Sequence, residues 1–150
     1  AALDEEFPGI YVDGGVSRHY EALPTIIADM EAAGTLDQFV VLGFGTNGAA
    51  REGEFEQIVD LLGNDRVIIL VMPYGDRWYM PEAKQKVIDF AKKYDNVYGA
   101  EWCQAATADT TLLRDDLIHP TLTGATAYAD AVHDALQQWV DREDGVPSTC

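Results

Sequence analysis

Residues 67–72 read Val67-Ile68-Ile69-Leu70-Val71-Met72, six apolar side chains in a row that stop at Pro73. An uninterrupted run rich in β-branched residues is typical of a strand that is buried on both faces of a sheet. A second run, Phe39 to Phe44, has the same character. Strands of this kind occur in parallel sheets covered by helices, so the two runs predict an α/β fold.

Amphipathic stretches separate these runs, with apolar residues at helical spacing. The expected helical segments are 20–33, 55–62, a segment that begins near Pro81, and a last helix that includes 128–139. Shorter runs at 10–12 and 97–102 predict further strands, and 104–120 reads as a loop. Strands alternating with helices predict a flavodoxin-like, three-layer α/β/α domain with a mainly parallel sheet.

Length and charge limit the class of protein. The chain has 150 residues, which suits a single domain over residues 1–150, with a frayed acidic tail from about 141. Lys and Arg number 10 against 26 Asp and Glu, for a formal net charge of −16. A field of that sign repels nucleic acid, which is therefore excluded as the main partner.

Asp116-Leu117-Ile118-His119-Pro120 precedes the last helix and carries the strongest chemical signal. A His that acts as a general base needs a fixed tautomer, and a carboxylate bonded to its Nδ1–H supplies one. A separation of three residues in a tight turn can place the Asp116 carboxylate on the His119 ring. Alone, the pattern also fits a solvated loop His beside a chance acid. Its position after the last strand favours a site, because open α/β sheets bind ligands at the carboxyl ends of their strands.

Two glycine-containing turns follow the other strands. In Gly43-Phe44-Gly45-Thr46-Asn47-Gly48, Gly45 permits a sharp turn and Asn47 offers an amide donor for an oxyanion hole. The alternative is an ordinary turn with Asn47 as a helix cap. In the turn at 13–19, backbone N–H groups near Ser17 could supply a second oxyanion donor and Arg18 could bind an acidic or carbonyl group. The alternative there is a flexible surface turn.

Trp78 and Tyr79 follow the strand at 67–72. Aromatic faces suit sugar rings, so both could line an acyl or sugar pocket; the alternative is that they pack on the edge of the sheet. Trp102 is expected in the core. No His cluster is present, so we expect no metal and no cofactor. Cys103 and Cys150 lack the spacing of a zinc site, and the sequence leaves open whether they form a disulfide.

Together these residues resemble the SGNH hydrolase superfamily of esterases and acyltransferases. Gly45-Thr46-Asn47 matches the family block whose Asn donates to the oxyanion, and Asp116 with His119 matches the block that supplies the triad acid and base. Residues 14–17 match the glycine block more loosely. A flavodoxin-like phosphate or flavin binder shares the architecture, but the chain lacks its Ser/Thr-rich phosphate turn.

The chain further resembles the extracytoplasmic SGNH-type domains of acyltransferase-three-type membrane O-acyltransferases, which include peptidoglycan O-acetyltransferases. Arg77-Trp78 and the run from Asp115 to Thr121 support this likeness. It implies a covalent acyl-enzyme that acts on acyl or acetyl esters of surface glycans, with His119 as base, Asp116 as its orienting acid, and Asn47 with backbone near Ser17 holding the oxyanion. It also implies a cell-surface location and an upstream transmembrane acyltransferase domain in the same protein.

The chain departs from this family at the nucleophile, which the family places in a Gly-Asp-Ser turn after its first strand. No Gly-Asp-Ser occurs, and the sequence's serines are Ser17 and Ser148, neither of which we assign as nucleophile. We therefore expect a fragment that is inactive alone, whose first strand and serine would stand immediately before Ala1. The sheet should then begin with the strand at Phe39, or contain a rearranged strand or one swapped from a second copy. A non-catalytic glycan-binding module is the alternative.

Overall fold

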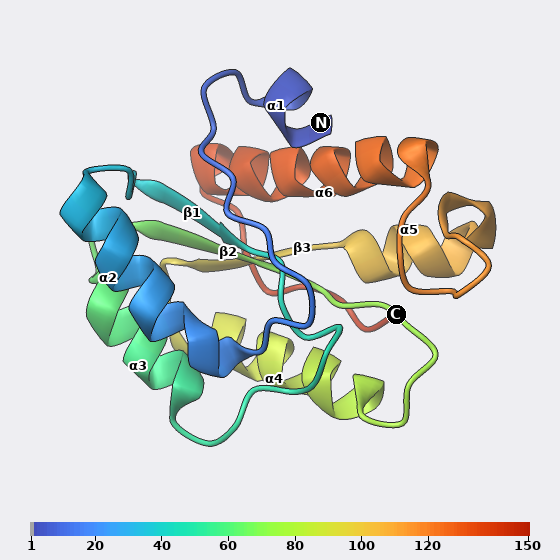
Figure 1. Ribbon diagram of the computed structural model, residues 1–150, viewed down its shortest axis with the longest axis horizontal. Coiled ribbons are helices and arrows are strands. Elements are labelled where there is room, and N and C mark those ends of the chain that lie inside the picture. The colour runs from blue at the N-terminus through green and yellow to red at the C-terminus, as the bar shows by residue number, and fades with distance from the viewer. Residues whose placement is uncertain (1) are drawn as a thin grey trace.

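The structure is a computed structural model that describes residues 2–150 (Figure 1). Three strands, β1 (Phe39–Leu42), β2 (Val67–Val71) and β3 (Val97–Ala100), form one parallel sheet in the order β1-β2-β3. The two apolar runs pair directly, with Val40 opposite Ile68. Helices cover both faces of the sheet, so the predicted α/β fold is confirmed.

The middle strand, β2, is buried along its whole length. Side chains alternate along a strand, so Ile68 and Leu70 pack into the core on one face, whereas Ile69 and Val71 pack into the core on the other. The prediction of a strand buried on both faces is correct for β2. It is less apt for β1 at the edge of the sheet, where the Phe39 side chain is 40% exposed.

Three helices, α2, α3 and α4, cover one face, and all lie where apolar spacing predicted them. Their bounds are α2 Leu23–Ala33, preceded by the 3-10 helix η1 (Tyr20–Ala22), α3 Glu54–Leu62 and α4 Met80–Lys93. Gly34 ends α2 in the left-handed conformation that closes a helix, and Pro81 lies in the first turn of α4.

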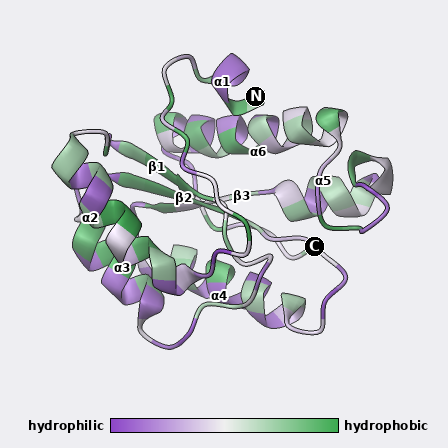
Figure 2. Ribbon diagram, viewed as in Figure 1, coloured by the Kyte–Doolittle hydropathy of each residue, from purple (hydrophilic) through white to green (hydrophobic). Residues whose placement is uncertain are grey.

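The opposite face is covered by α6, with α1 packed on α6 and α5 beyond the end of β3. Their bounds are α1 Ala2–Glu6, α5 Trp102–Ala108 and α6 Leu122–Asp141, with the 3-10 helix η2 (Thr110–Leu112) between α5 and α6. Figure 2 shows polar and apolar residues alternating along the helices, as expected of elements with one side on a core and one in solvent. The loop predicted over 104–120 was wrong in its first half, because α5 continues the chain directly from β3 and buries Trp102, Cys103 and Ala106.

The strand predicted at 10–12 is absent. Residues 10–17 form an extended loop in which the side chains of Tyr11, Val12 and Val16 are exposed. β-structure requires a partner strand for its backbone groups, and in the described chain the sheet begins with β1. That starting point is one of the arrangements that the sequence predicted; the alternative was a rearranged or swapped strand.

The tail after α6 is not frayed, which corrects the sequence-based expectation. Cys150 forms a disulfide with Cys103 in α5, and the Gly99 N–H donates to the carbonyl oxygen of Gly145 at 2.8 Å. The Ser148 backbone N–H and hydroxyl both donate to Glu101 Oε1, at 2.6 and 2.9 Å. Residues 142–150 therefore form a strap along the outer edge of β3.

Candidate active site

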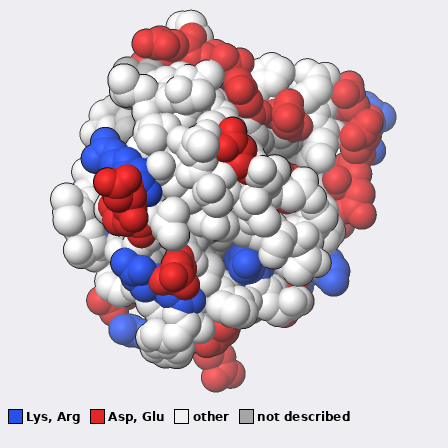
Figure 3. Space-filling model, turned by 90° about the vertical axis from the view of Figure 1, so that its right-hand side faces the viewer, with Lys and Arg blue, Asp and Glu red and all other residues white. Residues whose placement is uncertain are grey.

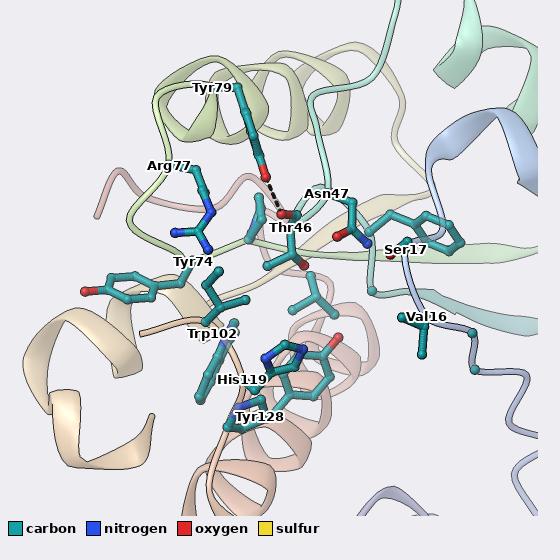
Figure 4. A pocket seen from close by; sticks show the side chains of 18 residues that line it. Val16, Ser17, Thr46, Asn47, Tyr74, Arg77, Tyr79, Trp102, His119 and Tyr128 are labelled. Carbon is teal, nitrogen blue, oxygen red and sulfur yellow. Dashed lines mark hydrogen bonds between the residues drawn. The ribbon is translucent and has the colours of Figure 1, made fainter. Parts of the chain in front are cut away.

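A cavity of about 610 Å³ lies at the carboxyl end of the sheet, where loops from four parts of the chain meet (Figure 4). The turn at 14–17, the turn after β1, the loop after β2 and the loop before α6 all contribute side chains. The site thus forms where parallel strands end and helix N-termini begin, the usual position for ligands in open α/β sheets.

The pair Asp116 and His119 is held by several hydrogen bonds at the cavity. Asp116 Oδ2 lies 2.7 Å from His119 Nδ1, and Oδ1 accepts hydrogen bonds from the backbone N–H groups of Ile118 (3.0 Å) and His119 (2.9 Å). The hydrogen bond with the His119 ring, aided by the two backbone donors, lowers the pKa of the Asp116 carboxyl well below its usual range. Asp116 is therefore a carboxylate at neutral pH and fixes the His119 tautomer with a proton on Nδ1.

His119 itself lines the cavity. With Nδ1 bonded to Asp116, Nε2 is the ring nitrogen left for chemistry, and no partner for it occurs among residues 2–150. An unprotonated Nε2 facing a cavity can take a proton from a hydroxyl group and return it to a leaving group. This geometry is that of the acid-base half of a catalytic triad.

Local sequence explains how this loop holds its shape. Leu117 adopts a left-handed backbone conformation (φ 55°), which turns the chain tightly enough for Asp116 to reach His119. The ends of the loop are closed by a bridge between Leu113 and Pro120 and by a 2.8 Å hydrogen bond from the Arg114 N–H to the His119 carbonyl oxygen. Thr121 then caps α6 by accepting from the Gly124 N–H at 3.1 Å.

Gly124 has no room for a side chain. A Cβ at this position would collide with the carbonyl oxygen of Leu112. The first turn of α6 therefore packs directly on the backbone of η2, which anchors the start of the helix behind His119.

The turn after β1 brings Asn47 and Thr46 to the cavity. Gly45 has φ +100°, a conformation that favours glycine, and a Cβ there would approach Pro73 Cγ to 2.9 Å. Gly45 therefore acts in the turn and does not itself line the cavity. The Asn47 side-chain amide donates to the Arg18 carbonyl oxygen at 3.1 Å, and its second N–H is left for another acceptor.

The turn at 14–17 is held beside the cavity by that bond. Ser17 lines the cavity in a left-handed conformation (φ 57°), next to Asn47 (Figure 4). Arg18 points elsewhere: its guanidinium forms an ion pair with Asp13 at 2.9 Å. The structure thus brings Ser17 to the site and leaves Arg18 outside the cavity.

Trp78 does not line the cavity, since its side chain is 87% exposed. Its neighbour Tyr79, named with it from the sequence, does line the cavity, and its hydroxyl donates to the Thr46 carbonyl oxygen at 2.7 Å. Trp102 is buried, as expected, but also forms part of the cavity wall.

Sequence reasoning gave no role to three further lining residues, Tyr74, Arg77 and Tyr128. Tyr74 and Arg77 follow β2, so their position after a strand was an available signal. Tyr128 lies in the second turn of α6, and its hydroxyl occupies the space that a Cβ at Gly43 would need. Burial raises the pKa of the Tyr128 phenol, which is therefore a neutral donor.

The described residues include neither a candidate metal site nor a candidate membrane-spanning helix. No three His, Cys, Asp or Glu side chains within 2–150 are grouped so that they could hold a metal ion. Among the helices described, none has the combined length and hydropathy of a membrane span.

The chain has detectable relatives, although no protein-family profile matches it. It is 26% identical over 129 residues to the O-acetyltransferase OatA of Staphylococcus aureus, and 25% identical over 126 residues to the peptidoglycan O-acetyltransferase OatA of Listeria monocytogenes. These alignments cover 85% and 84% of this chain, but 21% and 20% of the relatives. The chain therefore spans about a fifth of the length of the relatives it matches.

Two solved structures share the fold. The C-terminal catalytic domain of Streptococcus pneumoniae peptidoglycan O-acetyltransferase A, with a methylsulfonyl adduct, has a TM-score of 0.81 at 27% identity, covering 93% of this chain and 86% of that one. A carbohydrate esterase family 3 protein of Talaromyces cellulolyticus has a TM-score of 0.68 at 17% identity, covering 86% and 71%, and at that identity shows the fold alone.

The sheet, its carboxyl-end loops and the Asp116–His119 pair define an α/β domain of the SGNH type. Within that class the chain is homologous to the C-terminal catalytic domain of the peptidoglycan O-acetyltransferase OatA.

Proposed function

We propose that this domain transfers or hydrolyses O-acyl esters, acetyl esters above all, on cell-wall glycans. The observation that carries the proposal is the 2.7 Å bond between Asp116 and His119 at the rim of a cavity lined by aromatic side chains. The homology of this chain to OatA, which is named as an O-acetyltransferase, supports both the acyl chemistry and the glycan substrate.

In the proposed reaction a serine hydroxyl attacks the acyl carbonyl carbon while its proton moves to His119 Nε2. The negative charge that develops on the carbonyl oxygen is held by Asn47 and by backbone N–H groups near Ser17. The ester bond then breaks, and His119 returns the proton to the departing alcohol. A sugar hydroxyl or water attacks the acyl-enzyme by the reverse steps, with His119 again as base and Asp116 orienting it.

We infer that the serine is carried by a strand that pairs with the outer edge of β1. Three observations support this: no Gly-Asp-Ser occurs in the sequence, no other backbone segment of the described chain bonds to that edge, and the loop beside it leaves apolar side chains exposed. The strand could be another part of the same protein or could come from a second copy by strand exchange. Without it, the 150 residues are expected to be inactive.

The site of action is inferred to be extracytoplasmic. The Cys103–Cys150 disulfide suits an oxidising compartment, and homology to enzymes that modify the cell wall supports the same location. In the full-length protein, a membrane acyltransferase domain of the acyltransferase-three type would supply the acyl group to this domain.

The test compares the 150-residue chain with the same chain carrying a β-strand that ends in Gly-Asp-Ser fused ahead of Ala1. Turnover of 4-nitrophenyl acetate and acetyl transfer to a peptidoglycan fragment are measured, with light scattering to report any exchange of strands between copies. The extended protein should be active and the shorter one inactive. In the extended protein, His119→Ala and Ser→Ala in the added turn should each reduce kcat/KM by about 10³-fold or more, because the triad acts as a unit.

Ser148→Ala is the control, because it removes a serine hydroxyl that lies outside the cavity and should leave turnover within a few-fold. If the 150 residues alone are active and Ser17→Ala abolishes that activity, Ser17 is the nucleophile and the added strand is unnecessary. If a folded extended protein is inactive on both substrates, the enzyme assignment is wrong and the domain is a glycan-binding module.

A further inference from the structure

We propose that Tyr128 closes the part of the cavity that takes the acyl chain, and so limits the length of the acyl group. This inference rests on the proposed function, because it divides the same cavity between the two halves of an ester. The position of Tyr128 at the end of β1 and the burial of the residues around it support the assignment.

Tyr128 spans the space between α6 and the end of β1. It lies in the second turn of α6, and its hydroxyl occupies the position that a Cβ at Gly43 would take. Its ring packs on Trp102, with the ring centroids 5.5 Å apart. Gly124 seats the first turn of α6 directly on the backbone of Leu112, so the helix that carries Tyr128 is held in place. The phenol is therefore a fixed part of the cavity wall.

The cavity has a buried wall and an open side. Val71 is 2% exposed and Trp102 is 4% exposed, and both line the cavity together with the half-buried Tyr128. Val16 and Asn47, by contrast, line it from exposed turns. Figure 3 views the side toward which the strands run, where acidic side chains gather toward the margins and the central part is largely uncharged. The open side can thus admit a bulky alcohol without charge repulsion, whereas the wall is apolar.

The proposed reaction decides which part of the ester meets the wall. In the tetrahedral intermediate, Asn47 holds the carbonyl oxygen and His119 Nε2 gives a proton to the departing alcohol. The serine approaches from the open edge of β1, and a glycan alcohol has to leave through the open side. The acyl chain takes the direction that remains, toward Trp102 and Tyr128, which Figure 4 shows across the cavity from Asn47.

The Tyr128 hydroxyl adds a polar end to this wall. It forms no hydrogen bond with any residue of 2–150, and burial raises the pKa of the Tyr128 phenol, which is a neutral donor in need of an acceptor. Water supplies that acceptor when the cavity is free. An acetyl group lets such a water molecule remain, whereas a butyryl chain displaces it and leaves the hydroxyl unpaired beside methylene groups. Tyr128 is therefore a specificity-determining residue that takes no part in proton transfer.

The test measures kcat/KM of the extended protein for 4-nitrophenyl acetate and 4-nitrophenyl butyrate. The unaltered protein should prefer the acetate. Tyr128→Leu shortens the side chain and should raise the ratio of butyrate to acetate turnover by about tenfold or more, as expected when a pocket gains room for a methylene group. Tyr128→Phe keeps the ring but removes the unpaired hydroxyl, and should raise the ratio by about threefold to tenfold.

Tyr94→Leu is the matched control. It makes the same substitution at the end of α4, outside the cavity, and should leave the ratio unchanged. The ratio is the readout because a loss of folded protein lowers the turnover of both esters equally. Circular dichroism and thermal unfolding verify that each variant is folded.

A second measurement needs no turnover. An NMR titration of the 150-residue protein with acetate and with butyrate reports binding at the amide of Gly43, next to the Tyr128 hydroxyl. Each carboxylate stands for the acyl group with its oxyanion. Acetate should bind more tightly than butyrate, and Tyr128→Leu should remove this difference.

An unchanged ester ratio in folded Tyr128→Leu, or an equal change in Tyr94→Leu, would overturn the inference and leave the proposed function standing. If the folded extended protein turns over neither ester, the proposed function fails and the titration decides the inference. A preference for acetate that Tyr128→Leu removes would then support it. Equal binding of the two acids, or binding of neither, would overturn it.

Discussion

The two edges of the sheet are finished in opposite ways. Outside β3, the strap at 142–150 adds a backbone hydrogen bond and a disulfide, and leaves no open edge beside Gly99. Outside β1, no segment of the described chain bonds to the strand, and the adjacent loop at 10–17 exposes Tyr11, Val12 and Val16. One edge is closed by the chain itself, and the other is left open.

The two edges have different roles: the closed edge supports the wall of the cavity, and the open edge lies near the residues of the proposed chemistry. The closed edge holds Glu101 through Ser148 and joins Cys103 to the tail, so it fixes the start of α5 and with it the Trp102 wall. The open edge leads to Asn47 and Ser17, beside which we propose that the nucleophile is placed. An exposed edge strand is a place where another strand can pair, and natural proteins rarely leave one uncovered.

The largest effect is expected from opening the closed edge. Replacing both cysteines by serine should lower the free energy of unfolding by about 4 kcal/mol, the chain-entropy value for a bridge between residues 47 apart in sequence. Urea unfolding of the oxidised protein and the variant measures this. Ser148→Ala, which keeps the bridge and removes a hydroxyl bonded to Glu101, should cost about 1 kcal/mol. If the double cysteine variant loses less than about 1 kcal/mol, the strap contributes little to the free energy of unfolding.

A pair of glycines compares the two edges directly. A Cβ at Gly99 would collide with the ring of Pro147, so Gly99→Ala should displace the strap and cost about 1–3 kcal/mol. A Cβ at Gly14, in the loop at the open edge, meets nothing within 4 Å, so Gly14→Ala should change stability by less than about 0.5 kcal/mol. Equal costs in thermal unfolding would contradict the contrast between the edges.

Amide hydrogen exchange should show the same contrast without mutation. In the parallel ladder, Val40 and Leu42 direct their N–H groups toward β2, whereas Phe39 and Val41 direct theirs to the open edge. Phe39 and Val41 should therefore exchange faster than the Gly99 amide, which is bonded to the strap. Protection of Phe39 and Val41 equal to that of Gly99 would mean that the edge of β1 is covered.

The smallest effect concerns the Asp116–His119 pair at the carboxyl end of the sheet. The Asp116 carboxyl should titrate below the usual value of about 3.9 in a carbon-detected NMR titration, because His119 and two backbone N–H groups bond to it. Because the pKa of Asp116 is lower in the folded state than in the unfolded state, this carboxylate stabilises the fold when the pH is above the unfolded-state pKa. That stabilisation is lost as the pH falls through the folded-state pKa. His119→Ala removes the largest cause and should return the Asp116 pKa toward its usual range. Titration near 3.9 in the unaltered protein would show that the pair is not formed.

Local patterns predicted much of this molecule. The apolar run at β2 and the helical spacing of α2, α3 and α4 depend on burial and periodicity, which neighbours in sequence carry. The Asp116–His119 bond was equally accessible, because both partners lie in one turn. The predictions were wrong where the structure of a segment depends on residues far away in the sequence. Residues 10–12 have the composition of a strand but no strand beside them. The tail at 142–150 looks polar but is held by Cys103 and Glu101.

The sequence by itself determined the fold class, the position of the cavity after the strands, and the hydrogen-bonded pair of Asp116 and His119, since each follows from the order of residues within one element or turn. The tertiary structure alone decided that Cys103 and Cys150 meet, that Arg18 pairs with Asp13 and lies outside the cavity, and that Arg77 faces the cavity. These last features depend on which residues, far apart in the sequence, are brought together by packing. No local sequence pattern encodes those contacts.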